Sequence, residues 1–315
     1  MSLVVVGSIA FDAIKSPFGE RERTLGGSAV HCSLAASYFT DVRVVGPVGD
    51  DFGEEEYAVL HSHGVNTDDV EHIEGGQTFF WAGEYEWNVS VRHTLDTQLN
   101  VFGDFDPKLS DASRAADTLF LANIEPGLQR QVREECRDAK LAALDSMNFW
   151  IENTRDSLLR TIGTVDMLLM NDEEVRQLTE QPTLLKGVRR LMELGPRTVV
   201  VKQGEYGCAL FTADGGFFAL PAYPLETVLD PTGAGDSFAG GLLGYLDAQG
   251  GADDDATLRR AMTYGSAVAS YWVEEFGCER AERLTREEID ERYEAFRRMT
   301  SLEGVAESLK TRSSG

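Results

Sequence analysis

Short apolar runs alternate with amphipathic stretches along most of the chain. The runs are rich in valine and leucine and are predicted to be strands: 3–7, 42–46, 118–123, 141–145, 166–171 and 198–204. The stretches between them carry apolar residues at helical spacing: 28–39, 52–63, 127–140, 154–162 and 184–194. Strands that alternate with helices predict βαβ units, in which helices cover both faces of a mostly parallel sheet.

The last part of the chain has a helical pattern. Helices are predicted there over 235–249, 256–275 and 285–299. No internal repeat or low-complexity linker marks a second domain, and the chain ends in the polar stretch KTRSSG. The sequence therefore predicts one domain over 1–300 and a disordered tail at 301–315.

Residues 74–101 break the alternation of strands and helices. They alternate bulky and polar side chains, a period typical of antiparallel strands with one covered face. We interpret 74–101, together with 11–16, as a small β-sheet lid inserted into the main domain. A surface hairpin that packs on its own domain would explain this stretch equally well.

The composition is that of a globular protein. The chain has 315 residues, of which 42% are hydrophobic and 26% charged. No apolar run approaches the ~20 residues that span a bilayer, and the N-terminus lacks the basic segment and cleavage site of a secretory signal, so we expect a cytoplasmic protein. The cysteines lie far apart without a C-x-x-C pair, which argues against a zinc site or a disulfide framework.

The net charge narrows the choice of partners. Asp and Glu outnumber Lys and Arg by 53 to 29, which gives −24 at pH 7. Such a field repels nucleic acid and anionic membranes, and we expect neither as a partner. A polyanionic substrate must then be held by local donors rather than by the field of the whole protein.

The stretch LDPTGAGDSF (229–238) carries the clearest candidate chemistry. Its small residues leave the N–H groups of 233–236 uncovered where a helix is predicted to begin, and a helix N-terminus suits phosphate oxygens. Asp236 lies in the first turn and is placed to accept a proton from a hydroxyl that attacks the phosphate. From this motif alone, a carboxylate that only caps the helix is an equal alternative.

Two shorter motifs have both a structural and a functional interpretation. Asn171 and Glu174 are spaced as a capping box, and they are also spaced to face a hydrated Mg²⁺ that bridges phosphates; both can hold at once. The paired glycines of GGSAVH (26–31) allow either an ordinary tight turn or the close approach of a small polyol.

Four stretches follow one another in the order typical of one protein family. The stretch that begins GGSAVH at residue 26 resembles the N-terminal signature of the ribokinase-like (PfkB) carbohydrate and nucleoside kinases, and NDEE (171–174) matches their N-x-x-E motif. VVVKQGEYG (199–207) is similar to their strand and loop before the nucleotide, and DPTGAGDSF (230–238) looks like their C-terminal signature. The resemblance covers about residues 3–297. It implies a Rossmann-like three-layer α/β/α body with a β-sheet lid.

The resemblance also implies a role for each matching residue. Asp236 would be the catalytic base, and the amides of Gly233, Ala234 and Gly235 would form the anion hole for the transferred phosphoryl group. The remaining assignments are Asn171 and Glu174 to the Mg·ATP site, Lys202, Gly204 and Gly207 to the nucleotide phosphates, Asp12, Gly26, Gly27, His31 and Glu125 to the acceptor, and Asp230 and Thr232 to a monovalent cation such as K⁺.

The sequence departs from the family pattern at three positions. His31 stands where many members have Asn, which leaves the identity of the acceptor open. Pro231 interrupts the usual D-T-x-G-A-G-D run, which weakens the cation assignment only slightly. Lys202 stands where ribokinases often have Thr, and we expect it to contact phosphate.

The expected function is transfer of the γ-phosphoryl group of Mg·ATP to a hydroxyl of a neutral sugar or related polyol. The alternatives are an adenosine-like nucleoside kinase and a catalytically silent sugar-binding regulatory protein on the same fold. Asp12 would accept hydrogen bonds from vicinal hydroxyls, and together with Glu125 it would repel an anionic acid. A dinucleotide-binding dehydrogenase is excluded, because VVVGSIAFD after the first strand lacks G-x-G-x-x-G.

The aromatic residues of the lid also predict the oligomeric state of the protein. An apolar face formed by the lid aromatics would pair across a two-fold axis, so we expect a homodimer through the lid. The aromatics in question are Phe79, Phe80, Trp81, Tyr85 and Trp87.

Overall fold

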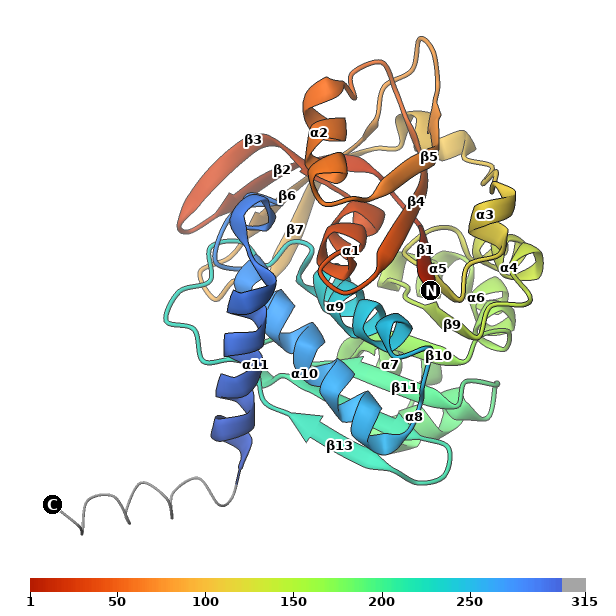
Figure 1. Cartoon of the computed structure of the whole chain (residues 1–315), viewed down its shortest axis with the longest axis vertical. Helices are drawn as coiled ribbons and strands as arrows, with labels where there is room; N and C mark the ends of the chain where they lie inside the picture. Colours follow the sequence, from red (N-terminus) through yellow and green to blue (C-terminus); the bar gives the residue numbers. More distant parts are fainter. Residues whose placement is uncertain (302–315) are drawn as a thin grey trace, which may run out of the picture.

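The computed structural model describes residues 1–301 and places a nine-stranded sheet at the centre of the molecule (Figure 1). The strand order is β13-β12-β11-β10-β9-β8-β1-β4-β5, with β12 and β13 antiparallel at one edge and all other neighbours parallel. The strands are β1 (Ser2–Val6), β4 (Asp41–Val48), β5 (Asn66–His72), β8 (Thr118–Leu121), β9 (Leu141–Leu144), β10 (Met167–Asn171), β11 (Thr198–Lys202), β12 (Cys208–Thr212) and β13 (Phe217–Leu220).

Helices cover both faces of this sheet. One face carries α1 (Ser28–Ala36), α2 (Glu54–Ser62), α9 (Ala234–Ala248), α10 (Asp255–Trp272) and α11 (Arg286–Thr300). The other carries α4 (Pro126–Glu135), α5 (Asn148–Asn153), α6 (Arg155–Ile162), α7 (Asp172–Thr179) and α8 (Leu184–Met192), and a short α3 (Asp111–Arg114) precedes β8. The predicted three-layer α/β/α body is confirmed.

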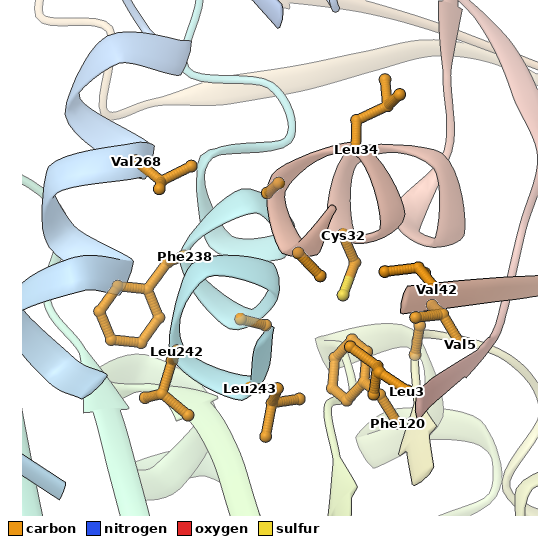
Figure 2. Close-up of a cluster of buried hydrophobic side chains, with 14 of the residues drawn as sticks. Leu3, Val5, Cys32, Leu34, Val42, Phe120, Phe238, Leu242, Leu243 and Val268 are labelled. Atoms are coloured by element: carbon orange, nitrogen blue, oxygen red, sulfur yellow. The ribbon is translucent and has the colours of Figure 1, made fainter. Parts of the chain in front are cut away.

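The alternation of side chains along β1 shows how one strand supplies both layers of core. Leu3 and Val5 point to the side of α1, α9 and α10, and Figure 2 shows both of them below Cys32 of α1. Successive strand residues point to opposite faces, so Val4 enters the other cluster instead. A strand buried on both faces has to be apolar throughout, which is why β1 reads SLVVV.

The strands that the sequence prediction missed lie at the two edges of the sheet. β5 has the sequence NTDDVEH and is half-exposed, so it shows no apolar run. β13 is a short strand whose outer side chains are exposed, and β12, its partner, follows a glycine turn. Edge strands need apolar residues on fewer sides than central strands, and the hydrophobic pattern is correspondingly weak there.

A second sheet of order β3-β2-β6-β7 stands beside the main body and forms the lid (Figure 1). Its strands are β2 (Ala10–Ser16), β3 (Gly19–Gly26), β6 (Phe79–Tyr85) and β7 (Arg92–Gln98). The separate sheet was predicted, but its extent was not. β3 has the exposed, charged sequence GERERTLG and gave no strand signal, and residues 100–104 form a 3₁₀ helix.

The prediction that the lid exposes an apolar face is wrong in part. Tyr85 is buried against Ile14 and Phe276 in a cluster that Trp81 also joins. Phe80 packs on the core of the main body, and Phe79 stacks on Phe102 with ring centroids 5.2 Å apart. Among the predicted aromatics, Trp87 stays open to solvent with 81% of its surface exposed. The lid therefore turns most of its aromatic surface toward its own domain.

Further expectations concern the cysteines, the membrane and the tail. All four cysteines are free and buried. Within residues 1–301, none of the helices has the length and apolar character needed to cross a bilayer. The tail predicted at 301–315 lies, apart from Ser301, outside the described residues.

Candidate active site at the carboxyl edge of the sheet

The carboxyl ends of the parallel strands and the N-terminus of α9 meet at one edge of the main sheet. In sheets of this kind, ligands bind beyond this edge, because the loops that follow the strands converge there. Asn171 and Lys202 are the last residues of β10 and β11 and lie opposite each other in register. Asp145 follows β9 directly. Most of the candidates from the sequence gather around these positions.

The N-terminus of α9 has the geometry of an anion site. Gly233 is the N-cap in the left-handed conformation, with φ 73°, and no side chain caps the helix. The N–H of Ala234 donates to the carbonyl of Pro231, so it is less free than the sequence predicted. Within the described chain the N–H groups of Gly235 and Asp236 make no hydrogen bond. These groups remain available to phosphate oxygens.

Asp236 lies in the first turn of α9, half-buried beside this anion site. Burial and the neighbouring carboxylate of Asp145 raise the pKa of Asp236 to about 6, against the opposing effect of His31 and Lys202. A carboxylate with a pKa near neutrality is a better proton acceptor than an ordinary aspartate while remaining ionised at pH 7.

Lys202 forms a buried ion pair that sequence reasoning missed. Its Nζ lies 2.5 Å from Oδ2 of Asp145, whose Oδ1 accepts the N–H of Ser146. Although burial acts in the opposite direction, Asp145 and Glu174 raise the pKa of Lys202 and keep it charged. A Cβ built on Gly235 would lie 3.1 Å from this ammonium group, so the positive charge sits directly beside the anion site.

Asn171 and Glu174 form the capping box that their spacing predicted. Oδ1 of Asn171 accepts the N–H of Glu174 at 2.8 Å, and Oε2 of Glu174 accepts the N–H of Asn171 at 2.9 Å. Burial and Asp145 raise the pKa of Glu174 to about 7, while Lys202 lowers it. A cation nearby would favour the ionised form of this carboxyl group.

The side-chain oxygens near the anion site suit a metal ion whose ligands are mainly water and phosphate. In the part of the chain that the structure describes, His, Cys, Asp and Glu side chains do not converge in any group of three that would hold a metal ion. Mg²⁺ keeps several waters and commonly takes one or two carboxylates plus substrate phosphates. Glu174 and Asn171 fit such a site, because they could contact the Mg²⁺ ion through its water ligands.

Four of the five acceptor candidates, all except Glu125, also lie together. Asp12 on β2 is buried, and its carboxylate fills the space over Gly26, where any Cβ would collide with it. Gly27 has φ 93° and lies against the carbonyl of Ser8, so the turn requires glycine. Nε2 of His31 lies 3.8 Å from Oδ2 of Asp12. These residues bring a buried carboxylate and an imidazole close together between the lid and the start of α9.

Other candidates have structural partners of their own. Glu125 caps α4, with Oε2 accepting the N–H of Leu128 at 2.9 Å, and it contacts none of the other acceptor candidates. Gly207 has φ 97° and packs against the carbonyl of Leu220, which makes it a turn residue. Gly204, with φ 55°, faces open space.

Asp230 and Thr232 connect α9 to other segments. The buried carboxylate of Asp230 accepts the N–H groups of Thr232 and Gly277, each at 2.8 Å. The hydroxyl of Thr232 lies 2.9 Å from the phenol of Tyr85 on the lid. The lid is thereby tied to the loop that forms the anion site.

Fold and site together define the class of protein as an α/β/α phosphotransferase with a β-sheet lid. The sequence profile of the family described as "pfkB family carbohydrate kinase" matches residues 2–283, and the chain belongs to this family. It is a sugar or nucleoside kinase that uses an alcohol group as acceptor, with ATP as the co-substrate expected of the family.

Individual relatives agree with this assignment. The chain is 30% identical over 316 residues to a nucleoside kinase of Methanothermobacter thermautotrophicus, covering 95% of this chain and 96% of the relative. It is 27% identical to a cytidine kinase of Thermococcus kodakarensis, with 78% and 88% coverage. The crystal structure of the Methanocaldococcus jannaschii nucleoside kinase superposes with a TM-score of 0.76 at 21% identity, covering 93% of this chain and 98% of that structure.

Proposed function

We propose that this kinase phosphorylates a hydroxyl of a nucleoside. The sequence alone ranked neutral sugars first and nucleosides second, and the lid reverses that order. Trp81 pairs directly with Asp12 in the register of β6 with β2, so the two side chains share one face of the lid. An indole beside the carboxylate that holds ribose hydroxyls offers a surface on which a base can stack.

The lid residues around Trp81 support this proposal. Its ring lies over Gly83, where a Cβ would collide with it, and the guanidinium of Arg92 lies 5.3 Å from the ring centroid. Ile14 and Phe276 continue the apolar surface. A base attached to a sugar at Asp12 would extend toward these groups, which a small sugar alone would leave without a ligand contact. The names of the two sequence relatives point in the same direction.

The phosphoryl transfer follows from the positions of Asp236, Lys202 and the helix N-terminus. Asp236 accepts the proton of the attacking hydroxyl. The hydroxyl oxygen bonds to the γ-phosphorus while the bond between that phosphorus and the ADP oxygen breaks. The free N–H groups at the start of α9 and the ammonium of Lys202 stabilise the negative charge of the transferred group. ADP leaves with the electron pair of the broken bond.

Mg²⁺ is the metal that fits this site. When bound, it would neutralise charge on the ATP phosphates, and Glu174 and Asn171 would hold its water ligands.

A monovalent cation near Asp230 and Thr232 is a separate proposal. Replacing K⁺ by Na⁺ in the assay tests it, and equal rates in the two salts would refute it.

The experiment that tests the acceptor class is an ATP-consumption assay of the purified protein. We expect kcat/KM for inosine, adenosine or cytidine to exceed that for ribose, fructose and inositol, and Trp81→Ala to lower the nucleoside value much more than the sugar value. 2-Keto-3-deoxygluconate should be the poorest acceptor because of the charge of Asp12. A sugar preferred over every nucleoside would refute the proposal.

Dimerisation through the lid remains part of this proposal. Trp87 lies beside Phe18, with ring centroids 6.2 Å apart, and Leu95 on the edge strand β7 is 61% exposed. Burying these side chains against a second copy would be favourable, and the unpaired edge of β7 would gain hydrogen bonds. Light scattering at micromolar concentration should give the mass of a dimer, and Trp87→Ser with Leu95→Ser should give a monomer. A monomeric wild type would contradict the proposal.

A further inference from the structure

His31 is wholly buried at the meeting point of the lid, α9 and α10. The indole Nε1 of Trp272 donates a hydrogen bond to its Nδ1 at 3.0 Å, and Trp272 is itself fully buried near the end of α10. Sγ of Cys278 lies 3.5 Å from the same nitrogen. The imidazole is therefore held on one side by groups that the sequence motifs did not indicate.

The contact with Trp272 decides which ring nitrogen of His31 carries the proton. An indole N–H can only donate, so Nδ1 has to present its lone pair. Although burial acts in the opposite direction, Cys278 and Asp12 raise the pKa of His31. A ring protonated on both nitrogens could not accept from Trp272, however, so while that hydrogen bond holds the proton resides on Nε2. The partner on Nδ1 thus makes Nε2 a hydrogen-bond donor.

This donor has no partner of its own. Nε2 of His31 is buried and makes no hydrogen bond within residues 1–301, and its nearest acidic oxygen, Oδ2 of Asp12, is 3.8 Å away. Leaving a buried donor unpaired is costly, so such groups in native proteins commonly have a ligand or a water as partner. The same ring packs against Gly233, where a Cβ would lie 2.5 Å from Cγ of His31. The unpaired donor therefore points toward Asp12, an acceptor candidate.

We propose that Trp272 is a positioning residue for acceptor recognition: by occupying Nδ1 of His31 it fixes Nε2–H as a donor to an acceptor hydroxyl that also binds Asp12. A hydroxyl suits both contacts, because its oxygen accepts from Nε2–H while its own proton is donated to the carboxylate. A methylene group at the same place makes neither contact. This inference rests on the proposed function only for the choice of nucleosides as test acceptors.

The first test reads the tautomer directly and needs no activity. Long-range ¹H–¹⁵N correlation spectra of protein labelled with ¹⁵N-histidine distinguish a protonated from an unprotonated ring nitrogen. The chain has five histidines, and His31→Asn identifies the signal of His31. We expect wild-type His31 to carry its proton on Nε2 and Trp272→Phe to show exchange between the two tautomers. A proton fixed on Nδ1 in the wild type would overturn the proposal.

The second test compares a nucleoside with its 2′-deoxy and 3′-deoxy analogues. The wild type should disfavour one analogue by about 10- to 100-fold in kcat/KM, as the loss of a hydrogen bond to a charged partner predicts. Trp272→Phe should reduce that ratio about 3- to 10-fold, chiefly through KM for the nucleoside. A Trp272→Phe enzyme that keeps the full ratio would contradict the proposal.

A double-mutant cycle separates this role from simple packing. The amide of Asn donates without help from Trp272, so Trp272→Phe added to His31→Asn should leave the ratio unchanged. A purely structural role of Trp272 would lower activity equally in both backgrounds and would refute the inference. If the wild type prefers sugars, the proposed function fails, while the spectra and deoxy analogues of the preferred sugar still test His31.

Discussion

At the scale of single residues, the central feature is that several buried charges share one small space. The carboxylates of Asp12, Asp145 and Asp236 lie near Lys202, His31 and the N-terminus of α9. The burial that raises the pKa of Asp236 also makes its ionised form costly. Function and stability are therefore expected to oppose each other at this residue.

Asp236→Asn should lower kcat and stabilise the fold at the same time. Loss of general-base help costs about 10²- to 10⁴-fold in rate. In the folded protein the pKa is about 6 against an ordinary 3.8, so the fold binds the proton more tightly than the unfolded chain does. Stability is therefore lost as the pH rises from about 3.8 to about 6, and the full penalty is present above pH 6. Asn removes that penalty, which is at most about 3 kcal/mol.

Kinetics and thermal melting at pH 7.5 check both halves of this prediction. The melting temperature of Asp236→Asn should rise while kcat falls. Asp247→Asn is a control from the same helix: this buried carboxylate accepts hydrogen bonds from Thr40 and Thr118, so the change should lower stability. An Asp236→Asn enzyme with near-wild-type kcat would remove Asp236 from the mechanism.

The pH profile follows from the same carboxyl group. Because the base works only when ionised, kcat/KM should fall as the pH drops through about 6. Asp145→Asn removes a neighbouring negative charge and should move this limb to lower pH. A limb that stays in place in Asp145→Asn would show that Asp145 does not act on the base.

At the scale of elements, the start of α7 combines a capping box with a proposed contact to Mg²⁺, and one substitution can separate the two. Glu174→Gln keeps an oxygen that can accept the N–H of Asn171, so the capping box should survive, but it removes the charge next to the anion site. The Mg²⁺ concentration for half-maximal activity should therefore rise with little change in melting temperature.

A second capping box provides the matched control. Glu288 accepts the N–H of Thr285 at the start of α11, remote from the anion site in sequence, and it also pairs with Arg280. Glu288→Gln should lower stability slightly and leave the Mg²⁺ dependence unchanged. If Glu174→Gln also lowers stability slightly and leaves the Mg²⁺ dependence unchanged, then Glu174 only caps α7.

The sequence predicted most of the elements on which burial imposes a pattern, although the buried strand β12, with the sequence CALFT, was missed. The central strands are apolar because both faces are covered, and the helices between them carry an apolar stripe. β3 and β5 were missed because exposed or edge strands tolerate charged residues. Helix starts at 171 and 234 were placed within a residue or two, since cap and glycine signals are local.

The site was predictable only where a local motif carries it. The glycines around α9 and the N-x-x-E box have fixed spacing, so Asp236, Asn171 and Glu174 could be named from the sequence. Asp145 and Trp272 could not, because their partners Lys202 and His31 are distant along the chain. For Asp145 a signal existed: it is the last residue of the predicted strand 141–145, as Asn171 is of the predicted strand 166–171.

At the scale of the whole molecule, the protein carries −24 charges and yet binds a polyanion according to this account. We propose a local solution: helix N–H groups and one ammonium would face the phosphates, and the charge of the surface is screened within about 10 Å at 0.1 M salt. KM for ATP should therefore fall as salt rises from low ionic strength, because screening removes the repulsion between the acidic surface and ATP. A KM that rises steadily with salt would show that local attraction dominates at every ionic strength.

The central claim is that Asp236 and the start of α9 transfer phosphate from ATP to a nucleoside bound at Asp12 and Trp81. The most direct measurement is kcat/KM for a nucleoside and for ribose in wild type, Asp236→Asn and Trp81→Ala. The account predicts a wild type that prefers the nucleoside, an Asp236→Asn enzyme about 10²- to 10⁴-fold slower on both acceptors, and a Trp81→Ala enzyme that loses only the preference. A wild type that prefers ribose, or an Asp236→Asn enzyme that is as fast as wild type, would contradict it.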